Sequence, residues 1–140
     1  MLNVLIVGGA GYIGGALVDL LAEAGHTVRV YDNLLYENEY RKPVDFVFGD
    51  IRDERRLRVE LDRADVIVWL AAIVGDGACG ANPDLAVEIN RDRVEWLSNN
   101  TDARIIFMST CSVYGANEGL LDETSVVNPL SVYAVTKLQA

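Results

Sequence analysis

The sequence predicts an α/β protein with a Rossmann-type, doubly wound parallel sheet covered by helices on both faces. Three observations carry this prediction. Short β-branched runs alternate with amphipathic segments, a glycine-rich turn follows the first run, and the polar clusters fall where the predicted strands end. Alternation of strand and helix is typical of parallel sheets, because two parallel strands need a crossover connection between them.

Five apolar runs are predicted as strands, because each is short and bounded by turn residues. They are Leu2–Val7, Thr27–Tyr31, Phe46–Phe48, Val66–Leu70 and Arg104–Met108. Four segments have helical spacing or helical composition: Tyr12–Ala24, Asp53–Leu61, Pro83–Asn99 and Ser131–Ala140. We expect Gly25 to end the first helix, Asp53 to cap the second and Pro83 to open the third. The polar segment 118–129 is predicted to be a loop.

The composition excludes several classes of protein. The chain has 140 residues, of which 51% are hydrophobic and only 3 are proline, so it has enough apolar material for one folded domain and is not a disordered chain. Its longest apolar run, Val66–Val74, is far shorter than the roughly 20 residues of a membrane span. Twelve basic and 21 acidic residues give a net charge of −9, which argues against nucleic acid as a partner.

The cysteines and the N-terminus indicate the compartment. Cys79 and Cys111 lack the spacing of zinc ligands and accompany a single histidine, so no metal site is predicted. No signal peptide is visible, since Met1–Val4 has no positive charge and leads directly into a strand pattern. We therefore expect a cytoplasmic protein.

The glycine-rich turn Gly8–Gly14 (GGAGYIG) follows the first predicted strand and opens the first helix. Such a turn lets a pyrophosphate approach backbone N–H groups at a helix N-terminus. A Walker-type loop is disfavoured, because Gly15 and Ala16 stand where it would have Lys and Ser or Thr. Taken alone, the motif is also compatible with a glycine-rich turn that binds nothing.

Two aspartates at predicted strand ends add to the evidence for a dinucleotide site that the glycine turn provides. Asp32 ends the second strand, where a carboxylate accepts hydrogen bonds from ribose hydroxyls and repels a 2′-phosphate. Because no arginine stands at position 33 or 34, NAD is preferred over NADP. Asp50 ends the third strand, where it can meet the adenine. The alternatives are a turn residue for Asp32 and a helix cap for Asp50.

Tyr133 and Lys137 lie four residues apart, so the phenol and the ammonium share one face of the last predicted helix. Proton exchange near neutral pH requires the tyrosine pKa to fall by roughly 2–3 from about 10, and a nearby ammonium acts in that direction. An ordinary surface pair is the alternative. Thr110 follows the fifth strand, where its hydroxyl can bond a substrate oxygen or a local turn. A nucleophilic Cys111 is disfavoured, because the chain offers it no histidine partner.

Taken together, the motifs resemble those of the extended short-chain dehydrogenase/reductases, in the NAD-dependent epimerase/dehydratase family. The resemblance spans the whole chain. It rests on these segments in this order: Gly8–Gly14, Tyr31–Leu34 (YDNL), Gly49–Ile51 (GDI), Leu70–Ala72 (LAA), Asn90, Ser109–Gly115 (STCSVYG) and Tyr133–Lys137 (YAVTK).

This resemblance implies an NAD-dependent enzyme and assigns roles to residues. It implies Tyr133 as the acid/base, Lys137 as the residue that binds the nicotinamide ribose and lowers the tyrosine pKa, and Thr110 as the hydroxyl that orients the substrate. The cofactor contacts that it implies are Gly8, Gly11, Tyr12, Ile13, Gly14, Asp32, Asn33, Asp50, Ile51, Leu70, Ala71, Ala72, Asn90, Ser109, Tyr133 and Lys137.

The chain departs from the family pattern after Thr110. Dehydratases of the family carry an Asp-Glu pair there, whereas this chain has Cys111 and Ser112. The departure favours epimerisation or simple oxidoreduction of a nucleotide-diphosphate sugar, by transient hydride transfer from a sugar hydroxyl, over loss of water. The alternative is a dinucleotide-binding module without turnover.

Family members are longer than this chain. We therefore expect residues 1–140 to be the NAD-binding N-terminal domain of a longer enzyme, lacking its C-terminal substrate lobe and binding NAD without turning over nucleotide sugars. The resemblance also implies a homodimer for the full-length enzyme, in which the helix 83–99 pairs with the Tyr133 helix. That helix carries Ile89, Val94, Trp96 and Leu97, more apolar surface than one sheet face needs.

Overall fold

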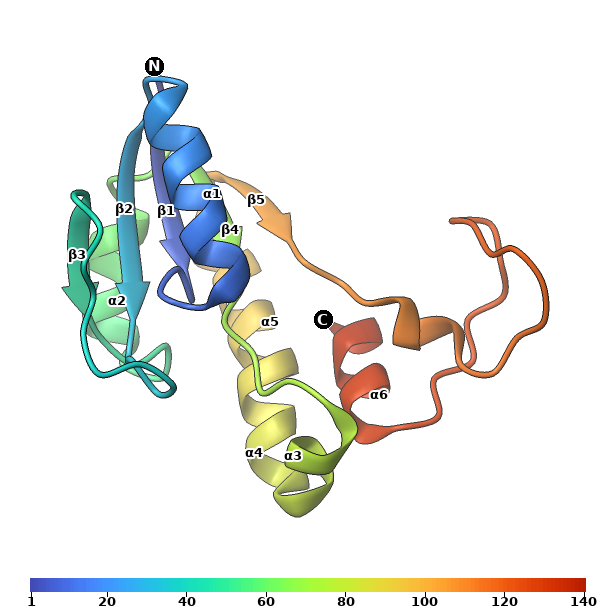
Figure 1. The fold of residues 1–140 in the computed structure, drawn as a ribbon. Coiled ribbons are helices and arrows are strands. Elements are labelled where there is room, and N and C mark those ends of the chain that lie inside the picture. The colour runs from blue at the N-terminus through green and yellow to red at the C-terminus, as the bar shows by residue number, and fades with distance from the viewer. The chain divides into compact units, whose positions relative to one another are not determined.

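The computed structural model describes residues 1–140 and divides into two compact units (Figure 1). The first unit comprises Met1–Ala71 and Leu97–Met108, and it contains the sheet. The second comprises Ala72–Trp96 and Ser109–Ala140, and it is mostly helical. None of the helices is long and apolar enough to cross a membrane.

The sheet of the first unit has five parallel strands in the order β3-β2-β1-β4-β5. The strands are β1 (Asn3–Val7), β2 (Thr27–Asp32), β3 (Asp45–Phe48), β4 (Val66–Trp69) and β5 (Arg104–Phe107). The order reverses between β1 and β4, which is the switch point where parallel sheets bind ligands. The predicted fold class is confirmed, and all five predicted strands are present.

Helices α1 (Tyr12–Glu23) and α2 (Glu54–Leu61) lie on opposite faces of this sheet (Figure 1). Both faces are apolar, which is why the strands read as continuous hydrophobic runs. The core on the α1 side consists of Val4, Ile6, Val18, Val28, Val30 and Val68. The side chains that alternate with these along the strands are also buried. They include Leu5, Val7, Tyr31, Ile67 and Trp69.

Local signals set the ends of both helices as the sequence predicts. Gly25 follows α1 with a φ of +81°, a conformation that favours glycine. The carboxylate of Asp53 caps α2 by accepting a hydrogen bond of 3.1 Å from the backbone N–H of Arg56.

The second unit corrects the predicted helix Pro83–Asn99. In place of one regular helix, the structure has α4 (Pro83–Val87), a π-helical turn η1 (Glu88–Asp92) and α5 (Arg93–Ser98) in succession. The wider π turn allows two sequence neighbours, Ile89 and Asn90, both to be buried. Apolar spacing does not reveal such a turn, because it adds one residue without changing the residue types.

Two short elements of the second unit were not predicted. Helix α3 (Asp76–Ala81) consists of small residues and lacks an apolar stripe, although it buries Cys79. A 3₁₀ turn, η2 (Cys111–Tyr114), follows Thr110. The last helix, α6 (Val132–Gln139), begins after Ser131, whose hydroxyl accepts a hydrogen bond of 3.1 Å from the N–H of Ala134. Residues 118–129 contain no helix or strand, as predicted.

Two neighbouring glycines of α1 allow a matched test of the packing. A Cβ on Gly14 would lie 2.5 Å from the Cα of Gly9, whereas on Gly15 the nearest atom would be the Lys42 Cε at 3.5 Å. We expect Gly14→Ala to lower the free energy of unfolding by about 1–3 kcal/mol, because backbone must move. Gly15→Ala should raise it by up to about 1 kcal/mol, because alanine favours the helix. Urea unfolding measures both, and equal effects would contradict this account of the turn.

Candidate functional site

The glycine turn is pressed against the sheet at three of its glycines. Gly8 has a φ of +84°, and a Cβ there would lie 2.5 Å from the backbone nitrogen of Ala71. A Cβ on Gly9 would meet the side chain of Val30 at 2.9 Å, and Gly14 packs on Gly9. Gly11 differs, since its Cβ would find no atom nearer than 3.6 Å. The protein's own packing thus explains three glycines, whereas a Cβ on the fourth would make only an ordinary van der Waals contact.

Gly11, the fourth of these glycines, lies at the N-terminus of α1. Gly11 is the N-cap residue and provides no side-chain cap, and the first turn of α1 contains no acidic residue. The first N–H groups of a helix have no partner within it, and they carry its partial positive charge. Tyr12 and Ile13 are exposed here. The residues present therefore fit an anion such as a pyrophosphate.

Asp32 links this turn to the loop that follows β2. Its Oδ2 accepts a hydrogen bond of 3.0 Å from the N–H of Ala10, and its Oδ1 accepts one of 2.7 Å from the N–H of Leu34. The turn role considered for Asp32 is therefore present. A ribose contact remains compatible with it, because each carboxylate oxygen has a second lone pair.

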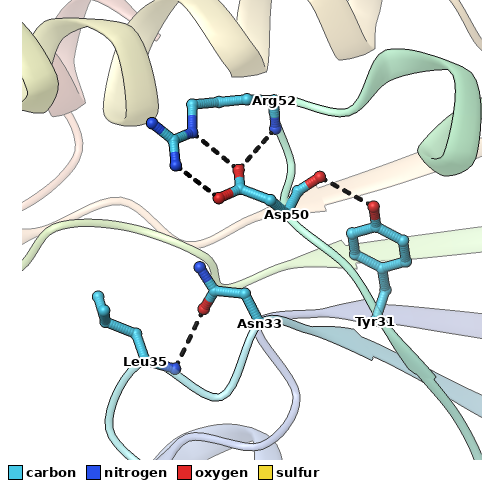
Figure 2. A network of polar contacts seen from close by, with 5 residues as sticks. All are labelled: Tyr31, Asn33, Leu35, Asp50 and Arg52. Carbon is cyan, nitrogen blue, oxygen red and sulfur yellow. Dashed lines mark hydrogen bonds and ion pairs between the residues drawn. The ribbon is translucent and has the colours of Figure 1, made fainter.

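Asp50 is held by Arg52 in the loop after β3 (Figure 2). Its Oδ1 accepts hydrogen bonds of 2.9 Å from both the backbone N–H and the Nε of Arg52, and its Oδ2 accepts one of 2.7 Å from Nη2. Hydrogen bonding to Arg52 lowers the pKa of Asp50 to about 2. The helix-cap alternative for Asp50 is wrong, because Asp53 caps α2.

The backbone around Asp50 is fixed from β2. Tyr31 is fully buried, and its hydroxyl donates a hydrogen bond of 2.8 Å to the carbonyl of Asp50 (Figure 2). Burial raises the pKa of Tyr31 to about 12, so this hydroxyl remains a donor. The Oδ1 of Asn33 accepts a hydrogen bond of 3.1 Å from the N–H of Leu35 (Figure 2). No sequence motif singles out Arg52, although it makes three hydrogen bonds with Asp50.

The first unit thus gathers most of the expected cofactor residues at the carboxyl edge of its sheet. Leu70 and Ala71 continue β4 there, both donating hydrogen bonds to the carbonyl of Val7 at 2.8 and 3.0 Å. The expected contacts that belong to this unit are Gly8, Gly11, Tyr12, Ile13, Gly14, Asp32, Asn33, Asp50, Ile51, Leu70 and Ala71. Their contact with a cofactor stays a prediction.

The second unit contains the expected acid/base pair on α6. Tyr133 is half-buried, whereas Lys137, one turn further on, is only 5% exposed. Burial lowers the pKa of Lys137 to about 8. A cation held in a protein interior destabilises the fold, so it marks a candidate functional group.

Thr110 and Ser109 precede η2 in the same unit. The hydroxyl of Thr110 accepts a hydrogen bond of 3.2 Å from the N–H of Ser112 and donates one of 3.1 Å to its Oγ. The local turn considered for Thr110 is therefore present, and a contact with a substrate stays a prediction. Cys111, the next residue, is an exposed free thiol.

Asn90 lies inside the second unit with 1% of its surface exposed. Its Oδ1 accepts a hydrogen bond of 2.8 Å from the N–H of Ile73, and its Nδ2 donates one of 2.9 Å to the carbonyl of the same residue. The amide is thus engaged within the protein. For Asn90, and equally for Ala72 and Ser109, the expected cofactor contact stays a prediction.

Comparison with known proteins gives consistent matches. The sequence model of the "NAD dependent epimerase/dehydratase family" matches residues 4–140. The UDP-glucose 4-epimerase of Rhizobium meliloti (strain 1021) is 36% identical over 143 residues, which cover 96% of this chain and 44% of that enzyme. The chain therefore spans less than half the length of this relative.

Solved structures of UDP-glucose 4-epimerases match the fold. That of the Brucella ovis enzyme in complex with NAD has a TM-score of 0.90 and 34% identity, and the match covers 97% of this chain and 44% of that one. That of the Thermotoga maritima enzyme with UDP-glucose has a TM-score of 0.89 and 28% identity, covering 97% of this chain and 48% of that one.

The buried ammonium of Lys137 predicts a pH-dependent stability. Its pKa is about 8 in the folded chain and about 10.5 when unfolded, so the protonated group destabilises the fold fully below pH 8. The penalty shrinks as the pH rises from about 8 and vanishes near 10.5. We expect Lys137→Met to raise the free energy of unfolding by about 2–3 kcal/mol at pH 7, and by progressively less above pH 8.

Lys42→Met is the matched control, because it removes the same charge from the ion pair with Asp19 in the first unit. We expect Lys42→Met to lower the free energy of unfolding by no more than about 1 kcal/mol, because ion pairs near the surface contribute little. Urea unfolding at pH 7 and above pH 8 measures both variants. A stability gain in Lys137→Met that does not change with pH would contradict the burial of a charged Lys137.

Proposed function

We propose, from the premise that this chain belongs to the NAD dependent epimerase/dehydratase family, that it binds NAD and serves in the epimerisation of a nucleotide-diphosphate sugar. The observation that carries this proposal is the buried Lys137 one helical turn from Tyr133. A lysine whose burial destabilises the fold is best explained by a chemical role beside the tyrosine.

The choice of NAD rests on the loop after β2. The carboxylate of Asp32 repels a 2′-phosphate and has lone pairs left for ribose hydroxyls. Arg52 does not serve as a cation for that phosphate, because its guanidinium is bound by Asp50. The Brucella ovis structure, which shares this fold, is described with NAD.

In the proposed reaction, NAD when bound supplies the hydride acceptor and afterwards the donor. Tyr133 takes the proton of a sugar hydroxyl and later returns one. The ammonium of Lys137 favours the phenolate form of Tyr133 and so lowers the tyrosine pKa. The hydroxyl of Thr110 bonds a substrate oxygen. Loss of water is not proposed, because Cys111 and Ser112 provide no carboxylate after Thr110.

A second candidate function is a dinucleotide-binding module without turnover. The observation that favours it is that most of the expected cofactor residues lie in the first unit, which does not contain the expected acid/base pair. Both candidates require NAD binding. They differ in turnover, and the assay of Tyr133→Phe below separates them.

We also propose that the enzyme forms a homodimer, on the family resemblance alone. The apolar side chains that prompted this expectation are already used within the chain, since Ile89, Val94 and Leu97 are buried and Trp96 is half-buried. They therefore leave little apolar surface on this helix for pairing. Static light scattering, which measures the mass in solution, tests the proposal, and a strictly monomeric protein would contradict it.

The role of Asp32 predicts cofactor preference. We expect NAD to bind at least tenfold more tightly than NADP, a difference of about 1.4 kcal/mol. Asp32→Asn removes the repulsion between this carboxylate and the 2′-phosphate of NADP. It should therefore lower the ratio of NAD to NADP affinity severalfold. Asp62→Asn, directly after α2, makes the same change in net charge and should leave the ratio of NAD to NADP affinity unchanged. Calorimetry measures the affinity of the unaltered chain and of each variant for NAD and for NADP. Equal affinities of the unaltered chain for the two cofactors would refute this role of Asp32.

The role of Tyr133 predicts loss of turnover with retained binding. In the full-length enzyme, we expect Tyr133→Phe to lower the rate of UDP-glucose epimerisation by roughly 10²–10⁴, the usual contribution of a positioned acid/base, with NAD affinity changed no more than a few-fold. Tyr36→Phe, an exposed tyrosine, is the control. If the full-length enzyme binds NAD and epimerises no nucleotide sugar, the binding module is the correct function. An active Tyr133→Phe variant would exclude Tyr133 as the base.

A further inference from the structure

A buried polar cluster lies beneath α6 in the second unit. Asn90, Thr136 and Cys79 are each at most 1% exposed. The side chain of Asn90 makes two hydrogen bonds with Ile73. Its Nδ2 also donates one of 3.4 Å to the Oγ1 of Thr136 and a longer one of 3.8 Å to the Sγ of Cys79. The thiol of Cys79 donates to the carbonyl of Ile73 at 3.3 Å. The cluster joins the π turn, α3 and the segment after β4 to α6.

Thr136 occupies the place in this cluster that touches the expected acid/base pair. It immediately precedes Lys137, and its hydroxyl donates a hydrogen bond of 2.9 Å to the carbonyl of Tyr133. The same oxygen accepts the hydrogen bond from Asn90. One side chain therefore connects the backbone of Tyr133 to the π turn.

The apolar contacts of α6 are less directional than these hydrogen bonds. Helix α6 packs on α3, α4, η1 and η2, and its other fully buried neutral side chain is the small Ala134. Apolar packing tolerates a small rotation or slide of a helix, whereas a hydrogen bond to a fixed amide does not. Asn90 is itself fixed, because both the N–H and the carbonyl of Ile73 hold its amide.

We propose that Thr136 is a positioning residue, whose hydrogen bonds to Asn90 and to the Tyr133 carbonyl hold Tyr133 and Lys137 in register on α6. The proposal rests on the proposed acid/base role of that pair, but the position of α6 can be measured without turnover. Loss of the hydroxyl leaves a buried N–H of Asn90 without this acceptor. Water reaches that amide only if α6 moves outward, and Lys137 is then exposed.

Lys137 reports such a movement directly. Burial lowers its pKa to about 8. The charged groups on the elements packed against α6 are Asp76, Asp84, Glu88, Arg91 and Asp92. Greater exposure therefore raises the pKa toward its ordinary value. The chain has only two lysines, Lys42 and Lys137, so ¹³C-labelled lysine gives two side-chain signals. Lys42, in the first unit, is an internal reference.

The test is an NMR titration of the ¹³Cε signals in the unaltered chain, Thr136→Val and Thr136→Ser, without cofactor. Valine keeps the shape of threonine and removes the hydroxyl, whereas serine keeps the hydroxyl. We expect Thr136→Val to raise the Lys137 pKa by about 0.5 or more and Thr136→Ser to restore it, with Lys42 unchanged throughout. Thr27→Val, an exposed threonine in β2, is the matched control and should leave both signals unaltered.

Two outcomes overturn the proposal. One is a Lys137 titration in Thr136→Val that matches the unaltered chain. The other is an equal rise in Thr136→Ser, which would assign the effect to the methyl group. If Thr136→Val does not fold, Thr136→Ala removes the same hydroxyl and is compared with Thr136→Ser in the same way. Because the titration needs no substrate, it stands even if Tyr133→Phe retains activity, which overturns only the proposed function.

Discussion

The close packing of the glycine turn on the sheet is the constraint on which the cofactor edge of the first unit depends. Gly8 lies against Ala71 at the end of β4, Gly9 lies against Val30 of β2, and Gly14 lies against Gly9 itself. These contacts bring the start of α1 to the switch point between β1 and β4. A side chain at any of the three positions would push the helix away from the strand ends. The position of α1 thus depends on the absence of side chains at Gly8, Gly9 and Gly14.

The acidic groups at this edge are fixed before any ligand arrives. Asp32 is held by two backbone N–H groups, and Asp50 is held by Arg52. Fixed groups lose little conformational freedom when they bind, so such an arrangement favours affinity and specificity. Lys137 represents the opposite case in the second unit, since its burial opposes folding. Both arrangements are typical of sites in which function, rather than stability, determines the residue.

Local patterns were sufficient to predict most of the fold. The signals that set these elements act within a few residues and can therefore be recognised in the sequence. They are the glycines after β1 and α1, Asp53 before α2 and the β-branched runs. Helix α3 and the π turn depend instead on tertiary packing, through the burial of Cys79 and Asn90. Their residues carry no apolar stripe that distinguishes them. Arg52 was missed for a related reason, because its partner is two residues away in a loop, and helical spacing does not describe that pair.

A net charge of −9 repels a pyrophosphate at long range, but the local distribution of charge at the helix terminus favours it. The first turn of α1 has no acidic residue, and Gly11, Tyr12 and Ile13 are exposed there. The charge of Asp32 is partly balanced by two N–H donors and that of Asp50 by a guanidinium. At physiological ionic strength, charges beyond about 8 Å are largely screened. The anion therefore responds mainly to the helix terminus, while the acidic remainder of the surface discourages a long polyanion such as nucleic acid.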